Sequence, residues 1–73
     1  VDKRVFDILK ILGKLNDYFK EIDMFDDYYQ EIEYFNIYRV MMYIIQQRYQ
    51  ENKDIREEFI DNGFKFLNDN FPN

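Results

Sequence analysis

Most of the side chains that carry enzyme chemistry are missing from this sequence. It contains no His, Cys, Ser or Thr, so the usual general base and the hydroxyl and thiol nucleophiles are absent. Carboxylates, Lys, Arg and Tyr remain. A carboxylate pair hydrolyses a glycosidic bond only across a cleft, and nothing in the sequence predicts a cleft. We therefore expect no catalytic residue, no cofactor-binding residue and no metal ligand in this chain.

The acidic side chains are concentrated in one run. Clusters of oxygen ligands hold Mg²⁺ or Ca²⁺ in some proteins, but the spacing here lacks the EF-hand pattern and its Gly. Such a run more often marks a solvated helix start, where the helix dipole favours negative charge, and we favour this interpretation. The run consists of Glu21, Asp23, Asp26, Asp27, Glu31 and Glu33, with no basic residue between Lys20 and Arg39.

Two further features have both a structural and a binding interpretation. Arg39 is the one cation in the apolar stretch 34–45. We expect its head to reach solvent or to pair with an acid of a neighbouring helix; the alternative is that it grips a partner carboxylate or phosphate. Tyr28 and Tyr29 beside Phe25 could stack on a sugar or a base, but their helical spacing favours the core and its rim.

Length, charge and hydropathy narrow the class of protein. The 73 residues are enough for a single domain, which we assign to 1–73. A net charge of −5 argues against a nucleic-acid binder and against a binder of anionic membranes. The longest uncharged run, 40–47, is far shorter than the roughly 20 apolar residues of a spanning helix. Charged residues also interrupt the N-terminal apolar positions, so we expect no signal peptide.

Apolar residues recur with the α-helical period through most of the chain, and no stretch alternates with period two. The first predicted helix covers about 3–22, with its apolar residues on one side and its charged residues on the other. Asp2 is the expected N-cap. Gly13 lowers helix propensity by about 1 kcal/mol, so we expect it to mark a close approach to another helix.

The second predicted helix covers about 26–50, with Asp23 or Asp26 as its N-cap. Its middle, 34–45, contains only two strongly polar residues, Asn36 and Arg39. A helix that is apolar on nearly every side is usually buried on most of them.

The third predicted helix covers about 54–70. Asp54 and Glu57 have the spacing of a capping box, and Asp61 and Lys65 have the i,i+4 spacing of a helical ion pair. Pro72 should end this helix because it disfavours the α conformation of the residue before it.

Three helices with short connections predict an all-α, up-down-up bundle. The second helix would pack on the other two, but two neighbours cannot enclose a cylinder. Part of its apolar middle should therefore stay uncovered, and large uncovered apolar patches usually mark docking surfaces. The alternative without a docking role is that the helices tilt and the tyrosine hydroxyls reach water. Our candidate docking surface comprises Tyr34, Tyr38, Met41, Met42, Ile45 and Phe71.

Three segments carry a family resemblance: the aromatic-rich 28–45, the last predicted helix 54–70, and the ending Phe71-Pro72-Asn73. Together they resemble the C-terminal helical tail of bacterial family 2 glycosyltransferases of the polysaccharide-synthesis type. In those tails a last helix closes on Phe-Pro-Asn, followed by Trp, a basic pair and Asn. The resemblance covers most of the chain, from about residue 8 onward, and its sharpest motif is the ending "NDNFPN".

The resemblance implies a parent enzyme whose catalytic domain lies outside this chain. That domain would be a Rossmann-like α/β fold that binds a nucleotide sugar and a divalent metal through an Asp-x-Asp motif. The stretch "DMFDD", 23–27, is not that motif because its Asp spacing differs and no strand precedes it. The chain would then be a non-catalytic, cytoplasmic accessory domain, at the inner face of the membrane, that packs on its catalytic domain or shapes the acceptor side.

The ends of the sequence and the exposed patch leave other expectations open. The absence of an initiator Met and the terminal position of Phe71 lead us to expect a fragment of a longer chain. The alternative function is a self-standing helical interaction or regulatory module, which could cover its patch by forming a homodimer. An amphipathic bundle on a membrane surface is a third option, which the net negative charge opposes.

Overall fold

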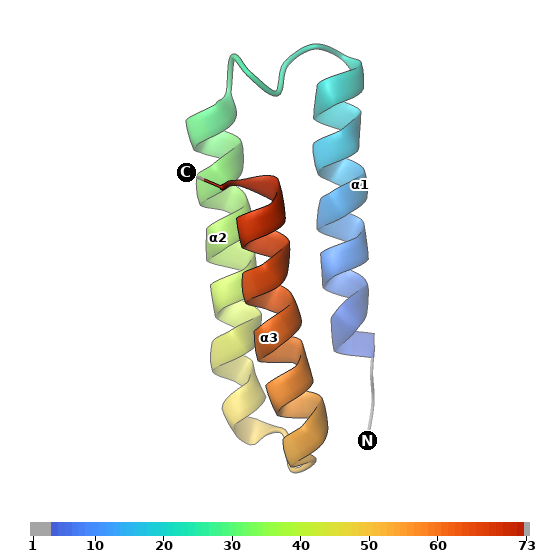
Figure 1. The fold of residues 1–73 in the computed structure, drawn as a ribbon, viewed down its shortest axis with the longest axis vertical. Helices are drawn as coiled ribbons and strands as arrows, with labels where there is room; N and C mark the ends of the chain where they lie inside the picture. Colours follow the sequence, from blue (N-terminus) through green and yellow to red (C-terminus); the bar gives the residue numbers. More distant parts are fainter. Residues whose placement is uncertain (1–3, 73) are drawn as a thin grey trace.

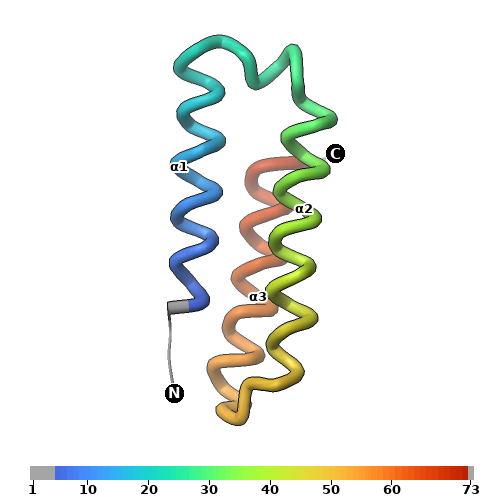
Figure 2. The backbone as a smooth tube through the Cα atoms, turned by 180° about the vertical axis from the view of Figure 1, so that it is seen from behind, coloured from blue at the N-terminus to red at the C-terminus, as the bar shows by residue number. Residues whose placement is uncertain are grey.

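The computed structural model describes residues 4–72 and shows an all-α bundle of three helices, with no strand in that range (Figure 1). A 3-10 turn, η1 (Arg4–Phe6), leads into α1 (Asp7–Glu21). The second helix is α2 (Tyr29–Gln46), which a second 3-10 turn, η2 (Gln47–Tyr49), separates from α3 (Lys53–Asn70). The helices run up, down and up, as predicted, and α2 contacts both of the others (Figure 2).

The first helix ends in a Schellman motif that the sequence did not reveal. Asp23 adopts a left-handed backbone conformation, with φ of 62°. The Met24 amide donates to the Phe19 carbonyl at 2.9 Å, and the Asp23 amide donates to the Lys20 carbonyl at 3.2 Å. These are the two hydrogen bonds of the motif, and Asp is one of the few residues other than Gly that tolerates this conformation. Asp23 therefore closes α1, and its predicted role as an N-cap of the second helix is wrong.

The second helix begins three residues later than predicted. Its N-cap is Tyr28, which makes no side-chain capping hydrogen bond, so Asp26 is not the cap either. Phe25 is buried in the preceding turn, where its ring lies 5.6 Å from that of Tyr29 and 5.9 Å from that of Phe71. We attribute the late start to this cluster, because burying Phe25 holds the turn outside the helix.

The third helix is capped by Asn52 rather than by the predicted capping box. The Asn52 side chain accepts a hydrogen bond from the Ile55 amide at 3.1 Å, which satisfies one of the free amides at the helix start. The cap thus lies two residues before Asp54. The other end agrees with the prediction, since α3 stops at Asn70, just before Phe71 and Pro72.

The predicted ion pair of α3 uses a different acid. Lys65 donates to Asp69 at 2.9 Å, one turn after it, instead of pairing with Asp61 one turn before it. The hydrogen bond from Lys65 and the charge of Asp69 together raise the pKa of Lys65 above its ordinary value. Both side chains are exposed, so the pair contributes little to stability.

Asp2, the expected cap of the first helix, lies outside the described residues.

The two glycines contact neighbouring helices to different degrees. A Cβ added to Gly63 would lie 3.0 Å from Cγ1 of Val40, which is fully buried and cannot easily move. A Cβ added to Gly13 would lie 3.8 Å from Cε1 of Phe66, an ordinary van der Waals distance. The close approach expected at Gly13 is therefore found at Gly63, between α3 and α2.

Candidate docking surface

Four of the six residues of the predicted docking surface are exposed. Tyr34 is 70% exposed and Ile45 54% exposed, and Tyr38 and Met42 are also in the exposed class. Met41 is half-buried. The rings of Tyr34 and Tyr38 stack on the outside of α2 with their centroids 6.2 Å apart. The expectation that the apolar middle of the second helix stays partly uncovered is confirmed, and the docking itself remains a prediction.

The sixth residue, Phe71, does not belong to an exposed surface. It is only 5% exposed, because the rings of Phe25 and Tyr29 lie 5.9 Å and 5.6 Å from it. Ile32 is buried in the same cluster. The expectation of an uncovered ring at the end of the chain is wrong, since the bundle covers Phe71 with its own α1–α2 turn and the start of α2.

The structure also places the side chains that had both a structural and a binding interpretation. The guanidinium of Arg39 lies over the ring of Phe35 on its own helix, 5.5 Å from the ring centroid, and the side chain is exposed. Phe25 and Tyr29 belong to the aromatic cluster around Phe71, whereas Tyr28 is exposed. These positions agree with the core-and-rim interpretation of the aromatic residues.

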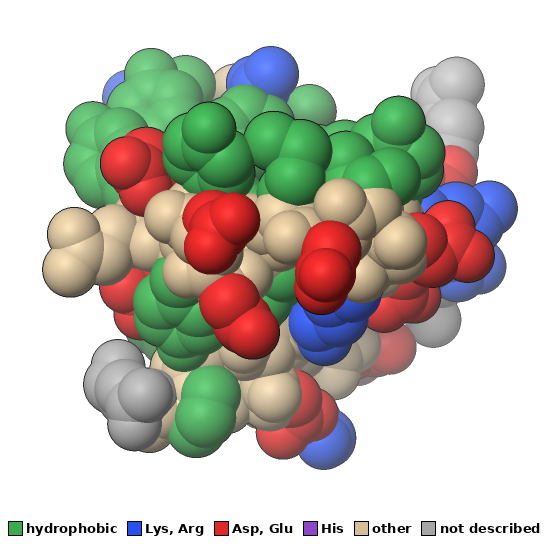
Figure 3. All heavy atoms as spheres, turned by 90° about the horizontal axis from the view of Figure 1, so that it is seen from above, with side chains coloured by type: hydrophobic (Ala, Val, Ile, Leu, Met, Phe, Trp, Pro, Cys, Tyr) green, Lys and Arg blue, Asp and Glu red, His purple; other side chains and the backbone are tan. Residues whose placement is uncertain are grey.

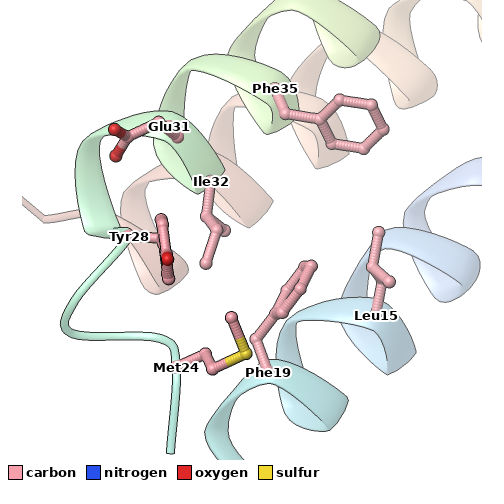
Figure 4. A pocket seen from close by; sticks show the side chains of 7 residues that line it. All are labelled: Leu15, Phe19, Met24, Tyr28, Glu31, Ile32 and Phe35. Atoms are coloured by element: carbon pink, nitrogen blue, oxygen red, sulfur yellow. The ribbon is translucent and has the colours of Figure 1, made fainter.

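An apolar groove between α1 and α2 was not foreseen from the sequence (Figure 4). Its volume is about 360 Å³. The side chains of Phe19, Met24 and Phe35 surround the open space, and the ribbon of α3 passes behind it (Figure 4). The groove thus opens on the side of the α1–α2 pair that α3 does not cover. Its lining residues are Leu15, Phe19, Met24, Tyr28, Glu31, Ile32 and Phe35.

Two regularly spaced rows of apolar side chains extend the groove along the helices. Residues three or four apart share a face of a helix, so each row continues the face on which its groove-lining members lie. Seen from above, hydrophobic side chains gather along one side of the molecule (Figure 3). We call this surface the open α1–α2 face: Ile11, Leu15, Tyr18 and Ile22 of the first row, and Tyr28, Phe35, Tyr38, Met42 and Ile45 of the second.

Acidic residues are concentrated at the turn end of the open α1–α2 face. Glu31 lines the groove, and Glu21, Asp23, Asp26 and Asp27 are exposed in and beside the α1–α2 turn. Within residues 4–72, no three of these acids come together in a group suited to a metal ion. All five are exposed, and we call them the acidic rim. Two of them, Asp23 and Asp26, line a separate recess of the turn together with Lys20 and Phe25.

Sequence reasoning missed a pair of hydrogen-bonded polar side chains in the core. Asn16 of α1 and Asn36 of α2 are fully buried and exchange two hydrogen bonds through their amides, at 2.9 Å and 3.0 Å. Asn36 also donates to the Ile32 carbonyl at 2.7 Å. A signal was present, because Asn16 follows Leu12 at helical spacing on the apolar side of its helix. Its pairing with Asn36 required the register of the two helices.

Gln47 is a second buried polar residue that the sequence did not single out. It is 6% exposed, and its Oε1 atom has no hydrogen-bond partner among the described residues. It lies in η2, at the end of the bundle opposite the α1–α2 turn.

Comparisons with known proteins add nothing to this picture. No protein family, no curated protein and no solved structure matches the chain. Among the described residues, no helix combines the length and the apolar character needed to cross a bilayer. The candidate site is therefore defined by its geometry alone, as an apolar groove with an acidic rim.

Proposed function

We propose that this bundle is a non-catalytic domain that binds another polypeptide through its open α1–α2 face. The observation that carries the proposal is the set of large apolar side chains that remain exposed on two adjacent helices, around an apolar groove. Contiguous apolar surface of this kind usually marks an interaction site, and Tyr and Met are common at such sites.

The more specific form of the proposal names the parent protein. The resemblance of 28–45 and of the ending Phe71-Pro72-Asn73 supports a family 2 glycosyltransferase that transfers a sugar from a nucleotide-sugar donor in cell-surface polysaccharide synthesis. The partner would then be the catalytic domain of the same chain, which would bind the nucleotide sugar and the divalent metal. This bundle would pack on that domain or shape the acceptor side, on the cytoplasmic face of the membrane.

The reading frame around these residues tests the glycosyltransferase proposal. We expect an upstream α/β domain with an Asp-x-Asp motif, and codons for Trp and basic residues directly after Asn73. A frame that starts at Val1 and stops after Asn73 would contradict the proposal.

The alternative is a self-standing helical interaction module. The stacked pair Tyr34 and Tyr38 favours it, because both rings are exposed on α2. A module of this kind binds its partner in trans, or a second copy of itself. Sedimentation together with an apolar-surface dye tests the docking function in either form, and a clean monomer that binds no dye would count against it.

A further inference from the structure

We infer that the groove between α1 and α2 takes an amphipathic α-helix of a partner polypeptide, with basic side chains beside the α1–α2 turn. This inference rests on the proposed docking function and names the chemistry of the partner. Three observations carry it: the spacing of the apolar rows, the shape of the groove, and the charge of its rim.

The spacing of the two apolar rows is that of a helical packing seam. The first row, Ile11, Leu15, Tyr18 and Ile22, advances by four, three and four residues. The second row, Phe35, Tyr38, Met42 and Ile45, advances by three, four and three residues. Alternating steps of three and four are what a helix presents to another helix packed along it. Two such rows on adjacent antiparallel helices form a surface on which one more helix can pack, as in a four-helix bundle.

The shape of the groove fits the side chains of an incoming helix. Phe19 and Phe35 project into the space from opposite helices, and the side chain of Met24 lines it from the α1–α2 turn (Figure 4). Among the lining residues only Ile32 is buried. In helical packing an apolar side chain of one helix inserts between side chains of its neighbours, and this space between two helices has that form.

The charge of the rim sets the polarity of the partner. Glu31 lines the groove, and four more acids are exposed at the turn: Glu21, Asp23, Asp26 and Asp27. No Lys or Arg occurs between 21 and 38. The side chain of Lys20, the nearest base before the run, lies over the ring of Phe25 at 4.9 Å. One base does lie beside the groove: Arg39, over the ring of Phe35, further along α2 from the turn. A partner with basic residues at the turn end is therefore electrostatically complementary.

The same charge argues against a second copy as the occupant. Each copy carries a net charge of −5, so two copies repel one another. A symmetric contact also places the same patch on both sides, and would set one groove opposite another instead of filling it.

Two synthetic peptides of about 18 residues, long enough for five helical turns, test the inference. Both peptides carry Leu at the heptad a and d positions. At the positions that flank a and d, one peptide has Lys and the other has Glu. We expect the Lys peptide to bind the whole chain roughly tenfold more tightly than the Glu peptide at low ionic strength, with the difference shrinking as salt is added. Two-dimensional NMR should place the largest shifts at Leu15, Phe19 and Phe35.

A charge reversal locates the effect at the groove. Glu31→Lys should remove most of the preference for the Lys peptide, whereas the matched control Asp61→Lys, on an exposed site of α3, should leave it in place. Circular dichroism checks that both variants stay folded. The inference is overturned if the two peptides bind equally, if the shifts lie outside the groove, or if sedimentation shows that a second copy covers these residues.

A separate readout distinguishes failure of this inference from failure of the proposed function. Binding of an apolar-surface dye to the unliganded chain reports the exposed face itself. Dye binding without any peptide preference would overturn the helix inference and leave the docking function standing. A monomer that binds neither dye nor peptide would overturn both.

Discussion

The buried pair of Asn16 and Asn36 gives the sharpest prediction about stability. Replacing one member, in Asn36→Leu, keeps a side chain of the same branching but removes both hydrogen bonds that link the two amides. Asn16 is fully buried, so its amide would be left in the core without those partners. The Ile32 carbonyl also loses its bond from the Asn36 side chain.

The expected loss follows from the number of polar groups left unpaired. A buried polar group without a partner costs about 1–3 kcal/mol, and the Asn16 side chain has two such groups. The two groups together cost about 2–6 kcal/mol, and added apolar burial from Leu offsets about 1 kcal/mol of this. The net loss in the free energy of unfolding is then about 1–5 kcal/mol, and we expect about 2 kcal/mol, towards the lower end. The total for a chain of this length is about 4–11 kcal/mol, so the loss is a large fraction of it.

Urea unfolding followed by circular dichroism measures the effect. With a slope of about 1 kcal/mol per molar, Asn36→Leu should lower the unfolding midpoint by about 2 M. The double variant Asn16→Leu/Asn36→Leu should recover most of the loss, because no amide is then left unpaired. Asn68→Leu, at an exposed site of α3, is the control and should change stability by less than about 0.5 kcal/mol.

The double-mutant cycle decides whether the reasoning holds. We expect a coupling of about 3 kcal/mol between the two positions, because both single variants are destabilised and the double variant is not. Purely additive effects, or a single variant as stable as the parent chain, would show that the amide pair does not hold α1 and α2 in register.

The remaining predictions concern the two glycines, the aromatic cluster and the cap of α3, and the same unfolding assay measures all of them. Gly13→Ala should stabilise the chain by about 1 kcal/mol through helix propensity. Gly63→Ala should give no such gain because of the contact with Val40. Equal gains at both sites would refute the close approach of α3 to α2 at Gly63. Phe71→Ala should cost about 3 kcal/mol, as for a buried ring, whereas a loss below about 0.5 kcal/mol would mean that the ring is not covered. Asn52→Ala should cost about 1 kcal/mol and Asp54→Ala less, and the opposite order would favour the capping box.

The helical content and the exposure of the second helix were predictable because both depend on local patterns. The helical period of the apolar residues predicted three helices. The apolar stretch 34–45 indicated that the second helix has more apolar surface than two neighbouring helices could cover. Tyr34, Tyr38, Met42 and Ile45 are exposed as a result. The end of α3 was also predictable, since the effect of Pro72 on the residue before it is local.

The predicted helix boundaries were wrong where a residue type stabilises either end of a helix with similar energy. Asp23 and Asn52 both belong to residue types that favour helix ends, but one closes α1 and the other opens α3. The acid run offered several equivalent caps for the second helix. None of them caps α2, which begins after Tyr28. We attribute this start to the burial of Phe25, and the sequence contains no local signal of that burial.

By itself, the sequence determined an all-α chain with three helical segments, because hydrophobic periodicity is read within one or two turns of a helix. Only the tertiary structure decided which apolar side chains would be covered. The cover for Phe71 comes from Phe25 and Tyr29, more than forty positions earlier in the chain, and the groove exists because α3 packs on the other side of the α1–α2 pair. Such contacts depend on the register and the relative placement of whole helices, which no local pattern specifies.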